Sequence, residues 1–187
     1  MLTMERPATK VWTRDEFCRL DDLGFFAPDQ RVELIQGEII DMGSQGSPHY
    51  QATDRTMRVL MSIFEPGHWV RNQGPLRLSN VSQPVPDIAV AVGTRDDYDD
   101  HPTTVVLVVE VSDTSLSFDR NQKARMYAQA GIADYWIVDV NNRQLEVRHQ
   151  PNPESGYAEV IVLNDTDTVS AVAAAHVSIA VKDLLPR

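Results

Sequence analysis

The sequence predicts a mixed α/β protein with one central sheet flanked by helices. Over residues 105–140 an apolar strand pattern, a helical pattern and a second strand pattern follow one another. This is the order of a βαβ unit with parallel strands and a right-handed crossover. Other strand and helix patterns surround the unit without a linker or repeat, which favours one packed domain over residues 1–187.

The N-terminal part of the chain predicts a short helix and a hairpin. Thr13 and Glu16 have the spacing of a capping box, so we expect a helix that runs to about Leu20. The segment RVELIQGEIIDMG predicts two strands, and Gln36 and Gly37 between them suit a tight turn.

A second, longer helix is predicted to begin at Ser47 and Pro48, as N-cap and first helical residue. Pro66 and Gly67 end it. Residues at helical spacing lie between these limits: Tyr50, Thr53, Met57, Leu60, Met61 and Phe64.

Strands dominate the rest of the chain. Three strand patterns cover residues 68–79, 86–92 and 105–112, and a polar loop separates the last two. A helix over 118–130, ended by Gly131, leads into a strand at 134–140. Next we expect an antiparallel pair of strands at residues 145–150 and 157–163. The tail, residues 177–187, should contain a last strand and a helical turn.

Composition limits the class of protein. The net charge of −10 argues against nonspecific binding to DNA or to an anionic membrane, because phosphate contacts need Lys and Arg. No apolar run approaches the roughly 20 residues of a membrane helix, and the first residues lack the apolar region of a signal peptide. With Cys18 as the single thiol, we expect a cytoplasmic protein with no membrane partner.

Two acids stand at the ends of apolar strands. Asp87 follows Pro86 at the start of one predicted strand, and Glu110 lies near the end of the next. If these strands are neighbours, the two carboxylates can reach one ion. Carboxylates, a backbone carbonyl and waters suit Mg²⁺ or Mn²⁺. We therefore expect a metal site here, with the carbonyl of Val111 as a candidate third ligand.

A lysine lies on the apolar face of the helix that follows. Positions 119, 123, 126, 127 and 130 share one face, and Met126 and Tyr127 mark it as the face packed on the sheet. Lys123 can thus reach the end of the strand that carries Glu110. A lysine beside a metal-bound water can stabilise charge on a phosphoryl oxygen, so the three residues together suit phosphodiester hydrolysis.

Three segments carry a family resemblance: PDIAV (86–90), VVEVSDTS (108–115) and DRNQKARMYAQAGIADYWIVD (119–139). They resemble the PD-(D/E)xK nuclease superfamily with its restriction-endonuclease-like fold, and within it the Uma-two branch of endonucleases. RVELIQGEII and SPHYQ also match that branch, so the resemblance covers nearly the whole chain.

The resemblance implies site residues and partners. It implies Asp87 and Glu110 as metal ligands and a lysine as the catalytic cation. Ser112 stands where the parent pattern has that lysine, and the branch resembled here carries it on the following helix, at Lys123. Glu33, which alternation puts opposite Val32 and Leu34, is implied as an extra ligand. A nucleic-acid substrate, DNA in preference to RNA, and a homodimer are also implied.

Each residue also has a structural interpretation. Asp87 suits a cap on the turn into its strand, Glu110 suits an ion pair, and Lys123 suits a lysine with its head in water. Only their convergence on one sheet end favours a site. Glu33 equally suits a solvent-facing strand position, and His49 suits a surface or capping residue more than a ligand.

Two function hypotheses follow. The first is a metal-dependent endonuclease that uses Asp87, Glu110 and Lys123. The second is an inert binding or assembly module that keeps the nuclease fold, which the net charge of −10 favours because it makes unassisted contact with DNA poor.

Overall fold

A six-stranded mixed sheet forms the centre of the protein, in a computed structural model that describes residues 8–187. Its strand order is β3-β4-β5-β6-β7-β8. Only β5 and β6 are parallel and all other neighbours are antiparallel, which confirms the mixed α/β class and the predicted parallel pairing. The strands are β3 (His68–Asn72), β4 (Ile88–Val92), β5 (Leu107–Ser112), β6 (Asp134–Asp139), β7 (Gln144–Asn152) and β8 (Gly156–Asn164).

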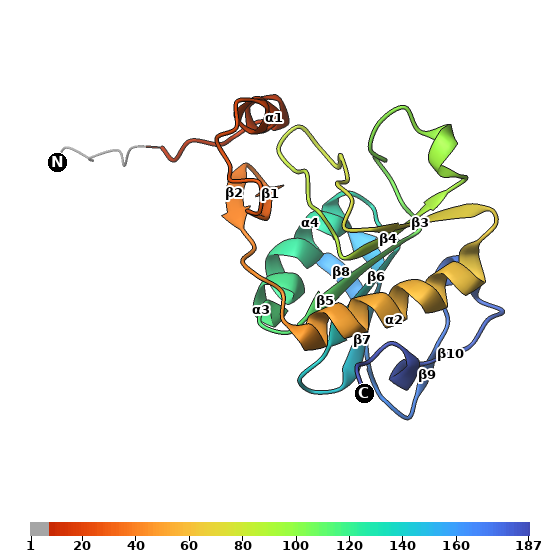
Figure 1. The fold of residues 1–187 in the computed structure, drawn as a ribbon. Helices are drawn as coiled ribbons and strands as arrows, with labels where there is room; N and C mark the ends of the chain where they lie inside the picture. Colours follow the sequence, from red (N-terminus) through yellow and green to blue (C-terminus); the bar gives the residue numbers. More distant parts are fainter. Residues whose placement is uncertain (1–7) are drawn as a thin grey trace.

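Helices cover both faces of this sheet (Figure 1). Helix α2 (Ser47–Phe64) crosses one face. The other face is covered by the connection between β5 and β6, which consists of α3 (Leu116–Phe118), the π-helical segment η2 (Asp119–Lys123) and α4 (Ala124–Gln129). Because successive side chains of a strand point to opposite faces, each face has its own apolar core.

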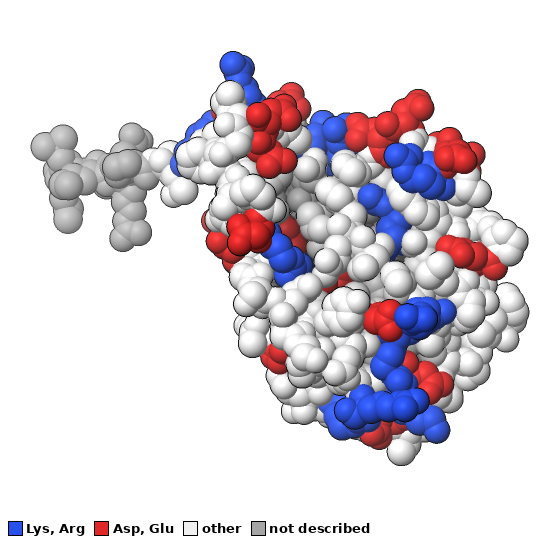
Figure 2. Space-filling view, in the orientation of Figure 1, with Lys and Arg blue, Asp and Glu red and all other residues white. Residues whose placement is uncertain are grey.

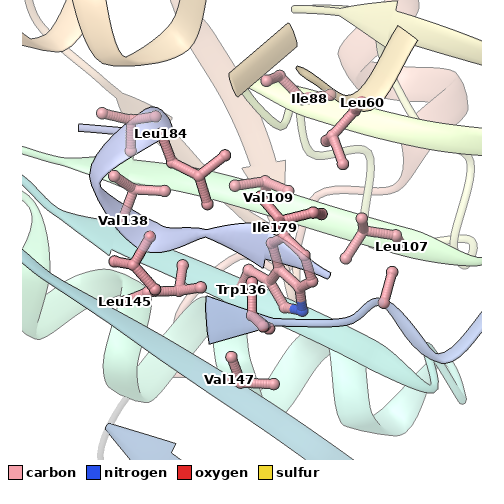
Figure 3. Packing of buried hydrophobic residues seen from close by; sticks show 14 of the residues in the cluster. Leu60, Ile88, Leu107, Val109, Trp136, Val138, Leu145, Val147, Ile179 and Leu184 are labelled. Atoms are coloured by element: carbon pink, nitrogen blue, oxygen red, sulfur yellow. The ribbon is translucent and has the colours of Figure 1, made fainter. Parts of the chain in front are cut away.

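The core beneath α2 is centred on Trp136, which is fully buried (Figure 3). Leu60 of α2, Val109 of β5 and Leu184 of the C-terminal segment belong to the same cluster. The core beneath α4 contains Tyr127 of that helix and sheet side chains such as Val108 and Ile137, which point to the face opposite α2. Burial on both faces explains why β5 and β6 are almost continuously apolar in sequence.

The N-terminal helix and hairpin form as the sequence predicts. Helix α1 (Arg14–Asp22) has Thr13 as N-cap, with both hydrogen bonds of the capping box to Glu16 present. Strands β1 (Val32–Ile35) and β2 (Glu38–Asp41) pair antiparallel. Gln36 and Gly37 make the turn with φ of 50° and 84°, in the left-handed region that glycine adopts readily.

Some boundaries differ from the predicted ones. Helix α2 has Gly46 as N-cap, so Ser47 is its first residue and not its cap. The strand predicted over 68–79 ends at Asn72. Gln73 has a positive φ of 48° there, which takes the chain out of extended geometry. Pro75, two residues on, has no N–H to donate to a neighbouring strand.

The last residues pack against the α2 face. β9 (Thr168–Val169) pairs with β10 (Ile179–Ala180), and η3 (Val172–Ala174) and η4 (Val181–Asp183) are single 3₁₀ turns. The last strand and turn were predicted, whereas β9 was not. One further turn, η1 (Arg95–Asp97), lies in the predicted loop. Across residues 8–187 no helix has the length and apolar character needed to span a bilayer. The prediction that the first residues lack a signal peptide falls partly on residues 1–7, which lie outside the described residues.

We expect Leu60→Ala to destabilise the protein by about 2–5 kcal/mol, because it leaves a cavity between α2 and the sheet. Urea unfolding followed by circular dichroism measures this change. Leu23→Ala is the control, since Leu23 is 74% exposed and its truncation should cost less than about 0.5 kcal/mol. Equal losses in both variants would contradict the packing described here.

Candidate active site

A cavity of about 290 Å³ opens at the end of the sheet where β4 begins and β5 ends. Segments far apart in sequence line it, including β1, the start of α2 and η2. Its wall contains five acidic residues, against two basic ones, Arg31 and Lys123. The acidic residues are Glu33, Asp87, Glu110, Asp113 and Asp119.

Asp87 and Glu110 lie beside each other in this wall. Strand β4 pairs antiparallel with β5 and Ile88 faces Val109, so the residue before β4 meets the last part of β5. The backbone N–H of Asp87 lies 3.4 Å from Glu110 Oε2, and the N–H of Val111 donates to Asp87 Oδ2 at 2.9 Å. Both carboxylates are buried. The structure thus brings together the two acids that the sequence singled out.

Lys123 joins them from the crossover helix. Its Nζ donates to Glu110 Oε1 at 2.9 Å and to Glu33 Oε1 at 3.2 Å. Only 2% of the lysine is exposed, so it does not extend its head into water. The buried glutamate at the end of an apolar strand and the lysine in an apolar helical face therefore compensate each other.

The helix backbone around Lys123 is π-helical, which the sequence pattern did not predict. The N–H of Ala124 points to the carbonyl of Asp119, five residues earlier, in place of the α-helical interval of four. Asp119 and Lys123 are both buried in this segment. Single π-helical turns of this kind are frequent at functional sites.

Glu33 is buried and does not face solvent. It lies on β1, and its Oε2 has no hydrogen-bond partner among the described residues. An unpaired buried carboxylate oxygen is costly unless a ligand or water satisfies it. Because its other oxygen accepts from Lys123 and its side chain lines the same cavity, Glu33 belongs to the same cluster as Asp87, Glu110 and Lys123.

Burial and charge shift the pKa values of the cluster in different directions. Burial raises the pKa of Glu110 to about 8, with the ammonium of Lys123 acting against it, and burial also raises the pKa of Glu33. Burial opposes the charge of Lys123, but the carboxylates of Glu110 and Glu33 outweigh it and hold that pKa above its ordinary value. Lys123 is therefore an ammonium at neutral pH.

Asp87 behaves differently from the two glutamates. Burial acts to raise its pKa, but the hydrogen bond with His49 and the N–H of Val111 outweigh burial, and its pKa lies below the ordinary value. Asp87 is therefore ionised at neutral pH. An ionised carboxylate beside an acid with a raised pKa is a common sign of a functional site.

His49 is a contact that the sequence interpretation missed. The sequence favoured a surface or capping role, yet the imidazole is buried, and its Nε2 lies 3.1 Å from Asp87 Oδ2. Its position could have indicated this, because His49, Thr53, Thr56 and Leu60 recur at helical spacing and are all buried.

Two more side chains support the cluster. Tyr127, interpreted as core, is buried but also donates its hydroxyl to Glu110 Oε1 at 2.6 Å. Asp119, the first residue of η2, accepts hydrogen bonds from Ser112 at 2.6 Å and from Ser115 at 2.5 Å. Ser112 stands where the parent nuclease pattern has its lysine. Through its hydrogen bond to Asp119, Ser112 is joined to the helical segment that carries Lys123.

The donor set suits a divalent cation held by two carboxylates. Within residues 8–187, no three His, Cys, Asp or Glu side chains are arranged to hold one metal ion, and Glu33 is bound to the ammonium of Lys123. Asp87 and Glu110 remain, with Val111 in the same cavity wall. Mg²⁺ is commonly bound by one or two carboxylates, with waters and substrate phosphates completing its shell, so these residues fit such an ion.

Comparisons with known proteins identify the family and the fold of the chain. Residues 14–182 match the Uma2 family, described as "Putative restriction endonuclease", and the chain belongs to this family. A crystal structure described as "a putative nuclease belonging to DUF820 from Anabaena variabilis ATCC 29413" has the same fold, with a TM-score of 0.73 and 18% identity. The match covers 92% of this chain and 96% of that one. No curated protein matches the chain.

We expect Lys123→Met to destabilise the protein by about 3–5 kcal/mol at pH 8, because two buried carboxyls lose their cation. The loss should shrink as the pH falls. In the wild type, Lys123 acts against the raised pKa values of Glu110 and Glu33, so without it both carboxyls take up a proton at a higher pH than they do in the wild type. The variant therefore regains stability relative to the wild type as the pH falls.

Urea unfolding of Lys123→Met at several pH values, with a chelator present, measures both effects. Lys182→Met removes an exposed lysine and is the control, with an expected change within about 0.5 kcal/mol. A loss in Lys123→Met that is as small as in the control, or that grows towards pH 5, would contradict the buried pair.

Proposed function

We propose that this member of the Uma2 family is an endonuclease that depends on Mg²⁺ or Mn²⁺ and hydrolyses phosphodiester bonds of nucleic acid. The convergence of Asp87, Glu110 and Lys123 in one cavity carries the proposal. Asp87 directly precedes β4, Glu110 lies in β5, and Lys123 lies in η2. Family membership and the nuclease-like fold support the same class of reaction.

The existing hydrogen bonds single out the atoms that would hold the ion. Lys123 and Tyr127 both donate to Oε1 of Glu110, which leaves Oε2 as the less occupied oxygen. Val111 N–H and His49 occupy Oδ2 of Asp87, whereas Oδ1 accepts only from the side-chain amides of Gln45 and Gln73, which a cation would replace. When bound by these atoms, a divalent ion supplies positive charge to a phosphoryl oxygen and lowers the pKa of a coordinated water.

Lys123 supplies the fixed positive charge of the site. Its ammonium is held by Glu33 and Glu110, so it needs no rearrangement to face charge that develops on a phosphoryl oxygen. In the overall reaction, water gives its hydroxyl to phosphorus and a proton to the leaving oxygen. The cavity wall contains more carboxylates than cations, and a divalent ion would balance this excess negative charge.

The surface charge is compatible with a polyanionic substrate despite the net charge of −10. Lys and Arg side chains, with acidic side chains among them, lie on the lower part of the face shown in Figure 2, near the C-terminal segment. Arg55 of α2 donates to the carbonyl of Lys182, and Arg143 donates to the carbonyl of Pro186, so these basic residues converge on that segment.

We propose DNA in preference to RNA as the substrate. We also propose a homodimer that offers one site to each strand.

Cleavage of supercoiled plasmid, single-stranded DNA and RNA with Mg²⁺ or Mn²⁺ tests the proposal. We expect cleavage that stops when a chelator is added. Asp87→Asn and Glu110→Gln should each reduce the rate about 100-fold or more, and so should Lys123→Met in the fraction that remains folded, because each removes charge from the transition state.

Asp97→Asn and Glu159→Gln change exposed acids away from the cavity and serve as controls that keep the wild-type rate. Cleavage that survives in both Asp87→Asn and Glu110→Gln would rule out this site. A folded wild-type protein that cleaves none of the substrates would favour the inert binding module.

A further inference from the structure

The imidazole of His49 forms part of the cavity wall but takes no part in the proposed reaction. It lies in the first turn of α2, is 8% exposed, and faces Asp87. We propose that His49 is a positioning residue: it fixes one oxygen of the Asp87 carboxylate so that the other oxygen stays turned towards the cation site. The inference rests on the proposed function and adds a residue to it.

Two donors from different elements meet on one oxygen of Asp87. The backbone N–H of Val111 reaches Oδ2 from β5 at 2.9 Å, and His49 Nε2 reaches the same atom from α2 at 3.1 Å. Together they set both the position and the rotation of the carboxylate plane. Because β5 is the centre of the sheet and α2 packs on the sheet face, neither donor can move without the core.

The contact with Asp87 requires a hydrogen on one particular ring nitrogen of His49. An ionised carboxylate oxygen only accepts, so Nε2 must carry the hydrogen that faces Asp87. On the other side of the ring, Nδ1 lies 3.4 Å from Oγ1 of Thr53, which is itself buried and lies 3.0 Å from the carbonyl of His49. The Thr53 hydroxyl donates to that carbonyl, and its oxygen packs beside Nδ1 on the side of the ring away from Asp87.

The second oxygen of Asp87 is held much less firmly. Its partners are the amides of Gln45 at 3.0 Å and Gln73 at 3.4 Å. Both lie in loops, Gln45 half-buried and Gln73 exposed. A cation can replace contacts of this kind, whereas the contacts on Oδ2 are buried. The asymmetry between the two oxygens is what points to a positioning role for His49.

A pair of amide variants separates positioning from a merely structural role. Glutamine places its amide N–H near the position of the imidazole Nε2, whereas asparagine is one methylene shorter and cannot reach Asp87. We expect His49→Gln to keep the Mn²⁺ affinity within about threefold and His49→Asn to lower it about 10–100-fold. The catalytic rate should follow the affinity, with the KM for DNA unchanged.

Titration calorimetry of the full chain with MnCl₂ measures the affinity, and plasmid cleavage gives kcat and KM. His176→Asn is the control, since His176 is exposed in the C-terminal segment and should leave both unchanged. If wild-type protein has a saturable Mn²⁺ site that both His49 variants keep equally well, this inference fails alone. If wild-type protein has no such site, the proposed function fails and the inference falls with it.

Discussion

The structure depends on the compensation of one buried ammonium. Lys123 is 2% exposed, and a buried charge without a partner would cost several kcal/mol. Glu110 compensates it from β5, and Glu33 compensates it from β1 of the N-terminal hairpin. A single lysine thus connects the crossover helix, the central sheet and the hairpin. Glu33 lies outside the six-stranded sheet, so the same contact helps to hold the hairpin at the cavity, together with the backbone hydrogen bonds between Leu34 and Gln83.

The site exists because both faces of the sheet contribute at the same end. The antiparallel register of β4 and β5 places Asp87 beside Glu110. The N-terminal turn of α2 brings His49 to Asp87 from one face, and η2 brings Lys123 to Glu110 from the other. No single element carries the cluster, so its geometry is a property of the whole sheet and its two layers of helices. A site built on strands and helices is held more firmly than one built on loops.

The sequence predicts the parts of the site that follow from periodicity. Asp87 and Glu110 could be predicted as neighbours because each ends an apolar strand, and Lys123 could be placed because its helical face also carries Met126 and Tyr127. The π-helical turn could not, since an apolar pattern does not record which carbonyl accepts each N–H. The partner of His49 could not either, because helical spacing predicts a buried face and not what lies opposite it. A two-residue strand such as β9 is too short to show alternation.

Diffraction from crystals grown with Mn²⁺ tests the central claim most directly, because the anomalous signal of manganese locates the ion independently of any activity. The arrangement of the site predicts one strong peak within coordination distance of Oδ1 of Asp87 and Oε2 of Glu110, with the ammonium of Lys123 still on Oε1. A peak bound elsewhere, or a cavity in which Lys123 alone faces the carboxylates at saturating Mn²⁺, would contradict it.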